Sequence, residues 1–180
     1  MTSTRSARTT RRIALVATSL TLALTGAGCS SSTAGAAAVV DGRRISVAEV
    51  QQATTDIAAY TGQEVAPSQV LFFLIVGPQL VKAAAANGVG ISDAEARQEL
   101  TTKVAEPSDA AIAAIRANES LQQLNGLGEA QGKPAVDAIV AQLKQSDIEV
   151  SPRYGRFDTT TVSVVPVEQN WLVPSGKASS

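Results

Sequence analysis

The middle of the chain carries the hydrophobic pattern of amphipathic helices. Between residues 46 and 147, apolar residues recur mostly at intervals of three and four, which is the spacing of one helix face. A glutamate follows both Ser46 and Ser92 three residues later, and this spacing predicts a capping box at each site. Glycine, Asn-Gly and proline residues close the segments. The expected helices span residues 46–62, 68–87, 92–106, 108–125 and 133–147, with Ser68 and Ser108 as further caps and Pro134 at the start of the last.

The second helix is the most apolar, and its pattern favours a buried central helix over a membrane span. Its uninterrupted apolar run extends only from Val70 to Val76, whereas a span needs about 20 apolar residues. Gly77 and Pro78 interrupt the run, and Lys82 adds a charge. We expect a kink at Pro78, because proline cannot donate a helical hydrogen bond.

The two ends of this helical region follow a different pattern. Short apolar segments flank Asp41-Gly42, a residue pair that favours a tight hairpin turn. Near the other end, Ile148 and Val150 alternate with Glu149, as in a half-buried strand, and Pro152 ends it. A lone strand needs a partner, and the N-terminal hairpin is the candidate.

Residues 1–28 have the composition of a secretory signal peptide. Four arginines and no acidic residue precede an apolar stretch of secretory length. Cys29, the only cysteine, follows directly, and this arrangement resembles the lipobox of bacterial lipoproteins. Gly26 stands where that family usually has leucine. The alternative is an ordinary secretory leader followed by a free thiol.

The lipoprotein resemblance implies an anchor in the lipid bilayer on the outer face of the cell membrane. In that family the cysteine thiol is diacylated and the leader is removed before it, which would place the lipid on Cys29. Residues 29–37 are mostly small and suit a flexible tether. The chain beyond residue 28 carries 11 basic and 16 acidic residues, a net charge of about −5, which argues against nucleic acid as a partner.

Composition also excludes most catalytic centres. The chain has no histidine, so histidine triads, histidine general bases and histidine zinc sites are ruled out. One cysteine forms neither an internal disulfide nor a thiolate metal cage, and we find no phosphate-binding glycine pattern. We therefore expect no metal, no cofactor and no enzymatic activity.

Both ends resemble those of the SurA and PrsA type foldases. The N-terminal segment has that group's strand, turn, basic residue, aliphatic residue and capped helix, here Val39, Val40, Asp41, Gly42, Arg43, Ile45 and Ser46. The C-terminal segment resembles its closing strand, here Val150, Pro152, Arg153, Tyr154 and Gly155. The resemblance implies a mainly α fold over residues 38–158, a SurA N-terminal-like module in which the two end segments pair. Residues 159–180, with Trp171, are expected to form an extended, partly disordered tail.

The same resemblance implies a chaperone that binds unfolded or partly folded secreted polypeptides. The chain has no room for the parvulin domain that many such foldases carry, so prolyl isomerisation is not expected. The candidate client-binding residues are Tyr60, Leu71, Phe72 and Phe73, and the alternative is that these side chains belong to the core.

Two alternatives remain open from the sequence. The protein could be an adaptor lipoprotein that binds one folded envelope partner, with Glu95, Glu99 and Glu106 as the recognition face or simply as solvated residues. Arg153 and Tyr154 could contact clients. The structural interpretation is favoured, in which Tyr154 packs the strand on the helices and Arg153 pairs with a helix carboxylate.

Overall fold

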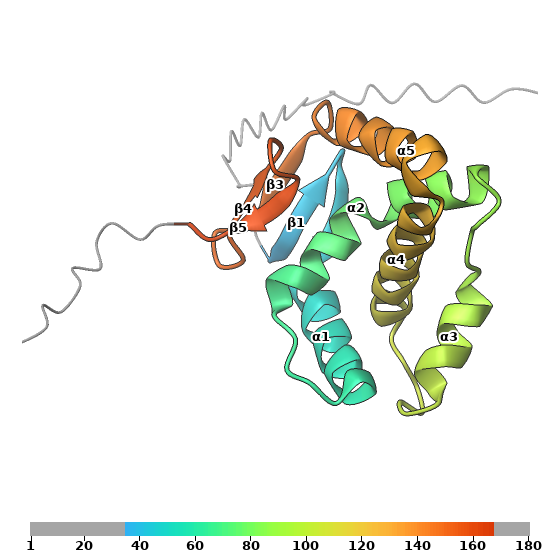
Figure 1. Cartoon of the computed structure of the whole chain (residues 1–180). Helices are drawn as coiled ribbons and strands as arrows, with labels where there is room; N and C mark the ends of the chain where they lie inside the picture. Colours follow the sequence, from blue (N-terminus) through green and yellow to red (C-terminus); the bar gives the residue numbers. More distant parts are fainter. Residues whose placement is uncertain (1–34, 168–180) are drawn as a thin grey trace, which may run out of the picture.

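The computed structural model describes residues 35–167, which form five helices, a three-stranded sheet and a two-stranded sheet (Figure 1). The predicted mainly helical fold is confirmed. The elements are β1 (Ala36–Val40), β2 (Arg43–Ser46), α1 (Val47–Thr61), α2 (Pro67–Ala86), α3 (Asp93–Thr101), α4 (Asp109–Gly126), α5 (Gly128–Leu143), β3 (Ile148–Val150), β4 (Arg156–Asp158) and β5 (Ser163–Val165). The predicted signal peptide, Cys29 and Trp171 lie outside the described residues.

The second helix, α2, is the centre of the molecule. It contacts α1, α4, α5, β1 and β5, and the helices gather around it on one side of the strands (Figure 1). By length and composition alone, α2 could also cross a membrane. In this fold it supplies eight residues to the interior, which agrees with the predicted buried helix. These residues are Val70, Leu71, Leu74, Ile75, Val76, Gly77, Leu80 and Ala84.

Three of the four predicted serine caps are confirmed. Ser46 and Ser92 form capping boxes with Glu49 and Glu95, and the Ser108 hydroxyl accepts a hydrogen bond from the Ala111 N–H. The prediction for Ser68 was wrong: α2 starts at Pro67 and has no side-chain cap. Proline at the first helical position needs no cap for its own nitrogen, which has no hydrogen to donate.

The start of the last helix was also predicted wrongly. Helix α5 begins at Gly128, only one residue after α4 ends, and Pro134 lies inside it. The reversal depends on glycine: Gly128 has φ +73°, and a Cβ on Gly132 would lie 2.0 Å from the Leu124 carbonyl oxygen. Proline at position 134 has no N–H to donate to the Ala130 carbonyl. Both residues are exposed, so water can bond this carbonyl and the proline is tolerated.

The predicted pairing of the two ends is confirmed. Strand β1 lies between β2 and β3 and is antiparallel to both. Asp41 (φ 49°) and Gly42 (φ 80°) are both left-handed, as a two-residue hairpin turn requires. The Asp41 backbone N–H donates to the Asp147 carbonyl, and the Asp41 carboxylate accepts the Asp147 N–H, each over 2.8 Å. Strand β1 includes Ala36 and Ala37, which the sequence pattern had placed in the tether.

After β3, the chain forms a hairpin that was not predicted from the sequence. Strands β4 and β5 pair antiparallel over three residue pairs. Gly155, directly before β4, has φ +121°. Tyr154 is half-buried and packs on the core, as expected. The expected ion pair of Arg153 is not found: its side chain is exposed and forms no salt bridge with any residue from 35 to 167. Pro152 follows the end of β3, as predicted.

Candidate functional site

The four predicted client-binding residues do not share one surface. Leu71 is 0% exposed and belongs to the core, so it is out of reach of a client in this fold. Phe72 and Phe73 are half-buried neighbours on α2 and point in different directions. Their ring centroids lie 5.3 Å apart in an edge-to-face arrangement. Only Phe73 lines the cleft between α1, α2 and α4.

Tyr60 links helices instead of lining the cleft. Its hydroxyl donates a hydrogen bond to the Glu99 carboxylate on α3, and the Lys103 ammonium lies 5.5 Å from its ring centroid. The bond to Glu99, with burial as a smaller cause, raises the pKa of Tyr60 to about 12. Tyr60 therefore anchors α3 to α1.

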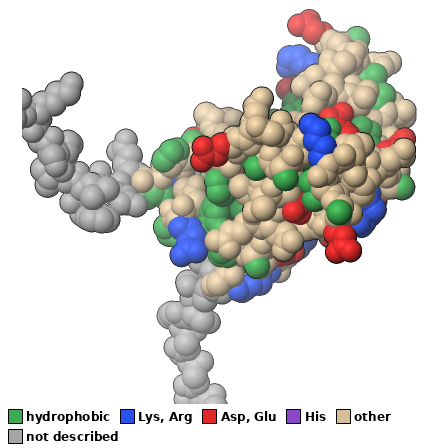
Figure 2. All heavy atoms as spheres, turned by 90° about the horizontal axis from the view of Figure 1, so that it is seen from below, with side chains coloured by type: hydrophobic (Ala, Val, Ile, Leu, Met, Phe, Trp, Pro, Cys, Tyr) green, Lys and Arg blue, Asp and Glu red, His purple; other side chains and the backbone are tan. Residues whose placement is uncertain are grey.

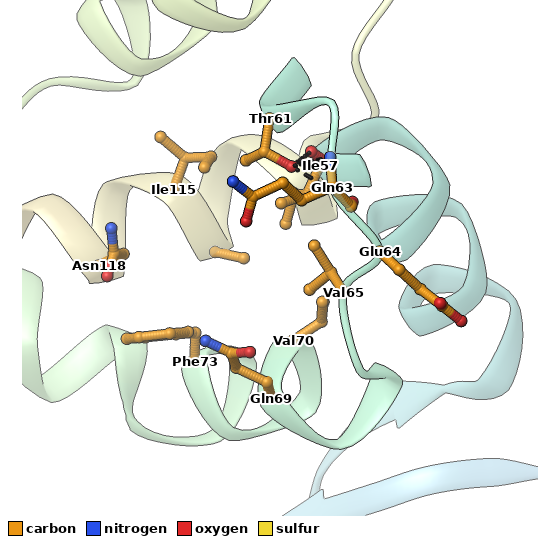
Figure 3. A pocket seen from close by; sticks show the side chains of 11 residues that line it. Ile57, Thr61, Gln63, Glu64, Val65, Gln69, Val70, Phe73, Ile115 and Asn118 are labelled. Carbon is orange, nitrogen blue, oxygen red and sulfur yellow. Dashed lines mark hydrogen bonds between the residues drawn. The ribbon is translucent and has the colours of Figure 1, made fainter. Parts of the chain in front are cut away.

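The largest apolar side chain at the candidate site is Phe73, which lines a cleft of about 250 Å³. The cleft lies between the end of α1, the connection to α2, the first turns of α2 and the middle of α4 (Figure 3). Its walls are Ile57, Thr61, Gln63, Glu64, Val65, Gln69, Val70, Phe73, Ala114, Ile115 and Asn118.

The cleft combines an apolar floor with a rim of amides. The floor consists of the aliphatic side chains and Phe73, while Gln63, Gln69 and Asn118 supply side-chain amides. In Figure 3 the side chains of Gln63 and Gln69 extend into the cleft, whereas Glu64 turns away from it. Among the described lining residues none is Lys or Arg. Amides both donate and accept hydrogen bonds, so this surface suits neutral groups such as a peptide backbone.

Hydrogen bonds at the end of α1 position Gln63, the rim residue in the connection to α2. Gly62 ends α1 in the left-handed conformation, with φ +70°. The Thr61 hydroxyl donates to the Ile57 carbonyl over 2.9 Å and accepts the Gln63 N–H over 3.3 Å. These bonds direct Gln63 back over the end of α1. The rim was missed from the sequence because Gln63 lies in a connecting segment without periodicity, while Gln69 on α2 and Asn118 on α4 have the pattern of ordinary polar helix positions.

A second hollow of about 290 Å³ lies on the other side of Phe73, along the line where α2 meets α4. Its charged residues are already engaged in the fold. The Arg43 guanidinium donates to the Leu74 carbonyl over 3.0 Å. Arg116 donates to the Ile91 carbonyl over 2.6 Å and to the Asp93 carboxylate over 2.7 Å. Phe73 therefore lines both hollows. The nearby Arg43 and Arg116 side chains form hydrogen bonds within the fold.

The acidic residues considered for an adaptor face serve mainly within the fold. Glu95 completes a capping box, although its side chain is exposed, and half-buried Glu99 accepts the bond from Tyr60. Glu106 is exposed as well. On the face shown in Figure 2, basic and acidic side chains are interspersed, with no continuous field of either sign. Within residues 35–167, no three His, Cys, Asp or Glu side chains come together as a metal site would require.

No family model, curated protein or solved structure matches this chain. The resemblance to the SurA and PrsA type foldases thus rests on the motifs at the two ends of the helical region.

Proposed function

We propose that the protein is a membrane-tethered extracytoplasmic chaperone that binds non-native segments of secreted polypeptides. The observation that carries the proposal is the cleft beside Phe73, with its apolar floor and its rim of neutral amides. Such a surface recognises what unfolded chains share: an apolar side chain next to an unpaired peptide group.

The size of the cleft favours weak binding of many clients. A volume of about 250 Å³ accepts one or two side chains. Burying one aliphatic or aromatic side chain contributes about 1.5–3 kcal/mol. Part of that gain offsets the entropy lost on association, so release is fast. This behaviour suits a protein that holds clients without catalysis, in line with a chain that has no histidine for isomerase chemistry.

The chaperone proposal is tested with a substitution on the cleft floor. Val65 is half-buried in the connection between α1 and α2, so Val65→Asp places a carboxylate among the apolar side chains and leaves every helix intact. The matched control is Val89→Asp, a half-buried valine in another connection that lies outside the cleft. The probe is chemically reduced α-lactalbumin, whose aggregation is followed by light scattering.

We expect the mature protein at stoichiometric ratio to slow aggregation, Val65→Asp to lose most of this effect, and Val89→Asp to keep it. A wild-type protein that leaves aggregation unchanged would contradict the proposal. Crosslinking in cells then separates the alternatives, because one dominant partner indicates an adaptor and a broad set of secreted proteins indicates a chaperone.

The tether forms a separate part of the proposal. It is supported by the leader and by Cys29 in a lipobox-like context, and it would hold the domain near polypeptides emerging on the outer face of the membrane. Intact-mass spectrometry of the membrane fraction is expected to show a diacylglyceryl mass on the wild-type protein that Cys29→Ala lacks. An unmodified, freely secreted wild-type chain would refute the anchor and leave the cleft proposal standing.

A further inference from the structure

Phe73 is a shared wall of two hollows that differ in charge. The cleft of Figure 3 has amides at its rim and no Lys or Arg among its described lining residues. The second hollow, of about 290 Å³, is lined by Arg43, Arg116 and Asp93, and two positive charges against one negative charge leave it positive. Its other walls are apolar, namely Phe73, Leu74, Gly77, Pro78, Val81 and Ala113.

The positive charge of the second hollow contrasts with the acidic chain around it. Beyond residue 28 the chain carries 11 basic and 16 acidic residues, a net charge of about −5. Arg43 donates to a neutral group, the Leu74 carbonyl, and forms no salt bridge with any residue from 35 to 167. In the described part of the chain, no carboxylate is therefore paired with this guanidinium.

Both arginines have N–H donors to offer a ligand while they hold the fold together. A guanidinium carries five N–H groups in a planar fork. The hydrogen bonds formed within residues 35–167 use Nη2 of Arg43, and Nε and Nη1 of Arg116. Arg43 is exposed, and 27% of the Arg116 side chain is exposed. These bonds hold the guanidinium groups in place, and a carboxylate is the group whose geometry matches their remaining donors.

The two hollows are close enough for one segment of polypeptide to enter both. Phe73 lines both of them, and the neighbours Ala114 and Ala113 on α4 line the cleft and the second hollow respectively. In an extended chain, side chains two positions apart point to the same side and lie about 6.5–7 Å apart. A segment that crosses Phe73 therefore places an apolar side chain in the cleft and a nearby side chain in the second hollow.

We propose that the cleft and the second hollow form one bipartite site, which prefers client segments that carry an acidic side chain beside an apolar one. The apolar side chain enters the cleft, and the acidic side chain meets the guanidinium groups of Arg43 and Arg116. The charge adds selectivity to weak apolar binding, because a basic side chain is repelled from the second hollow. The inference rests on the proposed chaperone function, for which it names the client class.

Peptides that differ at one residue test this preference on the mature protein. The probes are three fluorescein-labelled peptides with blocked ends and the same leucine- and valine-rich sequence, whose central residue is Asp, Asn or Lys. Binding is followed by anisotropy. We expect the Asp peptide to bind about fivefold more tightly than the Asn peptide, as for one partly exposed charge pair, and the Lys peptide to bind most weakly. Salt at about 1 M should remove most of the difference, because it screens exposed charges.

A substitution at Ala113 locates the preference and leaves both arginines in place. Ala113 is exposed and lines the second hollow, so Ala113→Asp adds a competing carboxylate there, and Ala113→Asn is the uncharged control of nearly the same shape. We expect Ala113→Asp to bind the Asp and Asn peptides equally, and Ala113→Asn to keep the fivefold difference. Val65→Asp, on the floor of the cleft, should weaken the Asn peptide as well, whereas Ala113→Asp should not.

Equal affinity of the wild-type protein for the Asp and Asn peptides would overturn the bipartite site. A preference that survives in Ala113→Asp, or binding of none of the three peptides, would overturn it too. The α-lactalbumin assay tests the chaperone function separately. Slowed aggregation without an acidic preference would retain the chaperone and refute the bipartite site. Unchanged aggregation, together with an acidic preference that Ala113→Asp abolishes, would refute the chaperone function and retain the site.

Discussion

At the residue scale, Arg43 resolves the problem that Pro78 creates inside the central helix. Proline has no N–H, so the carbonyl of Leu74, four residues earlier, has no regular helical donor. Arg43, from the strand β2, supplies it: the guanidinium Nη2 donates to this carbonyl over 3.0 Å. Arg43, the basic residue after the hairpin turn, therefore has a structural role: it joins the three-stranded sheet to α2.

We predict that Arg43→Ala destabilises the protein by about 1–2 kcal/mol, because it leaves a partly buried carbonyl unpaired. In a Pro78→Ala background, where residue 78 regains its N–H, the same substitution should cost less than about 0.5 kcal/mol. Urea unfolding of the four proteins measures both values. Arg153→Ala is the control, since Arg153 is exposed and without an ion pair in the described part of the chain. Equal costs of Arg43→Ala in both backgrounds would contradict the coupling.

A buried carboxylate plays a similar part at the start of α4. Asp56 on α1 is 8% exposed, and its Oδ2 accepts the Ser108 N–H over 2.9 Å. We predict that Asp56→Ala lowers the free energy of unfolding by about 1–3 kcal/mol, since the Ser108 N–H loses its acceptor. Asp56→Asn keeps an oxygen at this place and should cost less than half as much. Chemical unfolding measures the difference, and equal losses would show that the hydrogen bond contributes little.

At the element scale, polar side chains attach α3 to its neighbours, because only Ala96 and Leu100 of this helix are buried. Tyr60 on α1 holds Glu99, and Arg116 on α4 holds Asp93 at the start of the helix. Glu119 on α4 is near this cluster. Burial raises the pKa of the Glu119 carboxyl, and the neighbouring Glu99 carboxylate raises it further.

The raised pKa of Glu119 has a defined consequence for stability. The folded protein holds this proton more tightly than the unfolded chain, so the stabilisation is complete below the ordinary value of 4.5 and is lost as pH rises through the folded pKa. We predict that Glu119→Gln raises the Tm at pH 7 by up to about 2 °C, a small effect because the group is partly solvated. Near pH 4 the difference should vanish. Thermal unfolding at both pH values, with the exposed Glu64→Gln as control, tests this, and a larger gain at pH 4 would contradict it.

At the scale of the whole molecule, the fold is closed by contacts between its two ends. Strand β3 pairs with β1, and Asp41 and Asp147 exchange two hydrogen bonds across 106 positions of the sequence. The five helices lie between these paired ends in the sequence. Strand β3 therefore contributes to stability far more than its three residues suggest.

We predict that a chain ending at Ser146 loses cooperative thermal unfolding, because β1 loses one of its two partners and the Asp41 turn loses its anchor. A chain ending at Gly155 keeps β3 and lacks only residues 156–180, so it should unfold cooperatively at a moderately lower Tm. Circular dichroism of the two chains measures the contrast. Similar melting curves would show that the pairing of the ends is dispensable.

What the sequence determined by itself was local: the capping boxes at Ser46 and Ser92, the Asp41-Gly42 turn and the buried character of α2. Each depends on residues within a few positions of one another, so pattern and backbone preference suffice to predict it. The pairing of the ends was predicted from the need of a lone strand for a partner and from the family resemblance, since nothing local specifies which strands meet. Only the tertiary structure decided that Leu71 is inaccessible, that Phe73 lines a cleft and that Arg43 donates to the Leu74 carbonyl. These features arise from the packing of distant segments, and they depend on how helices cross, which no short stretch of sequence encodes.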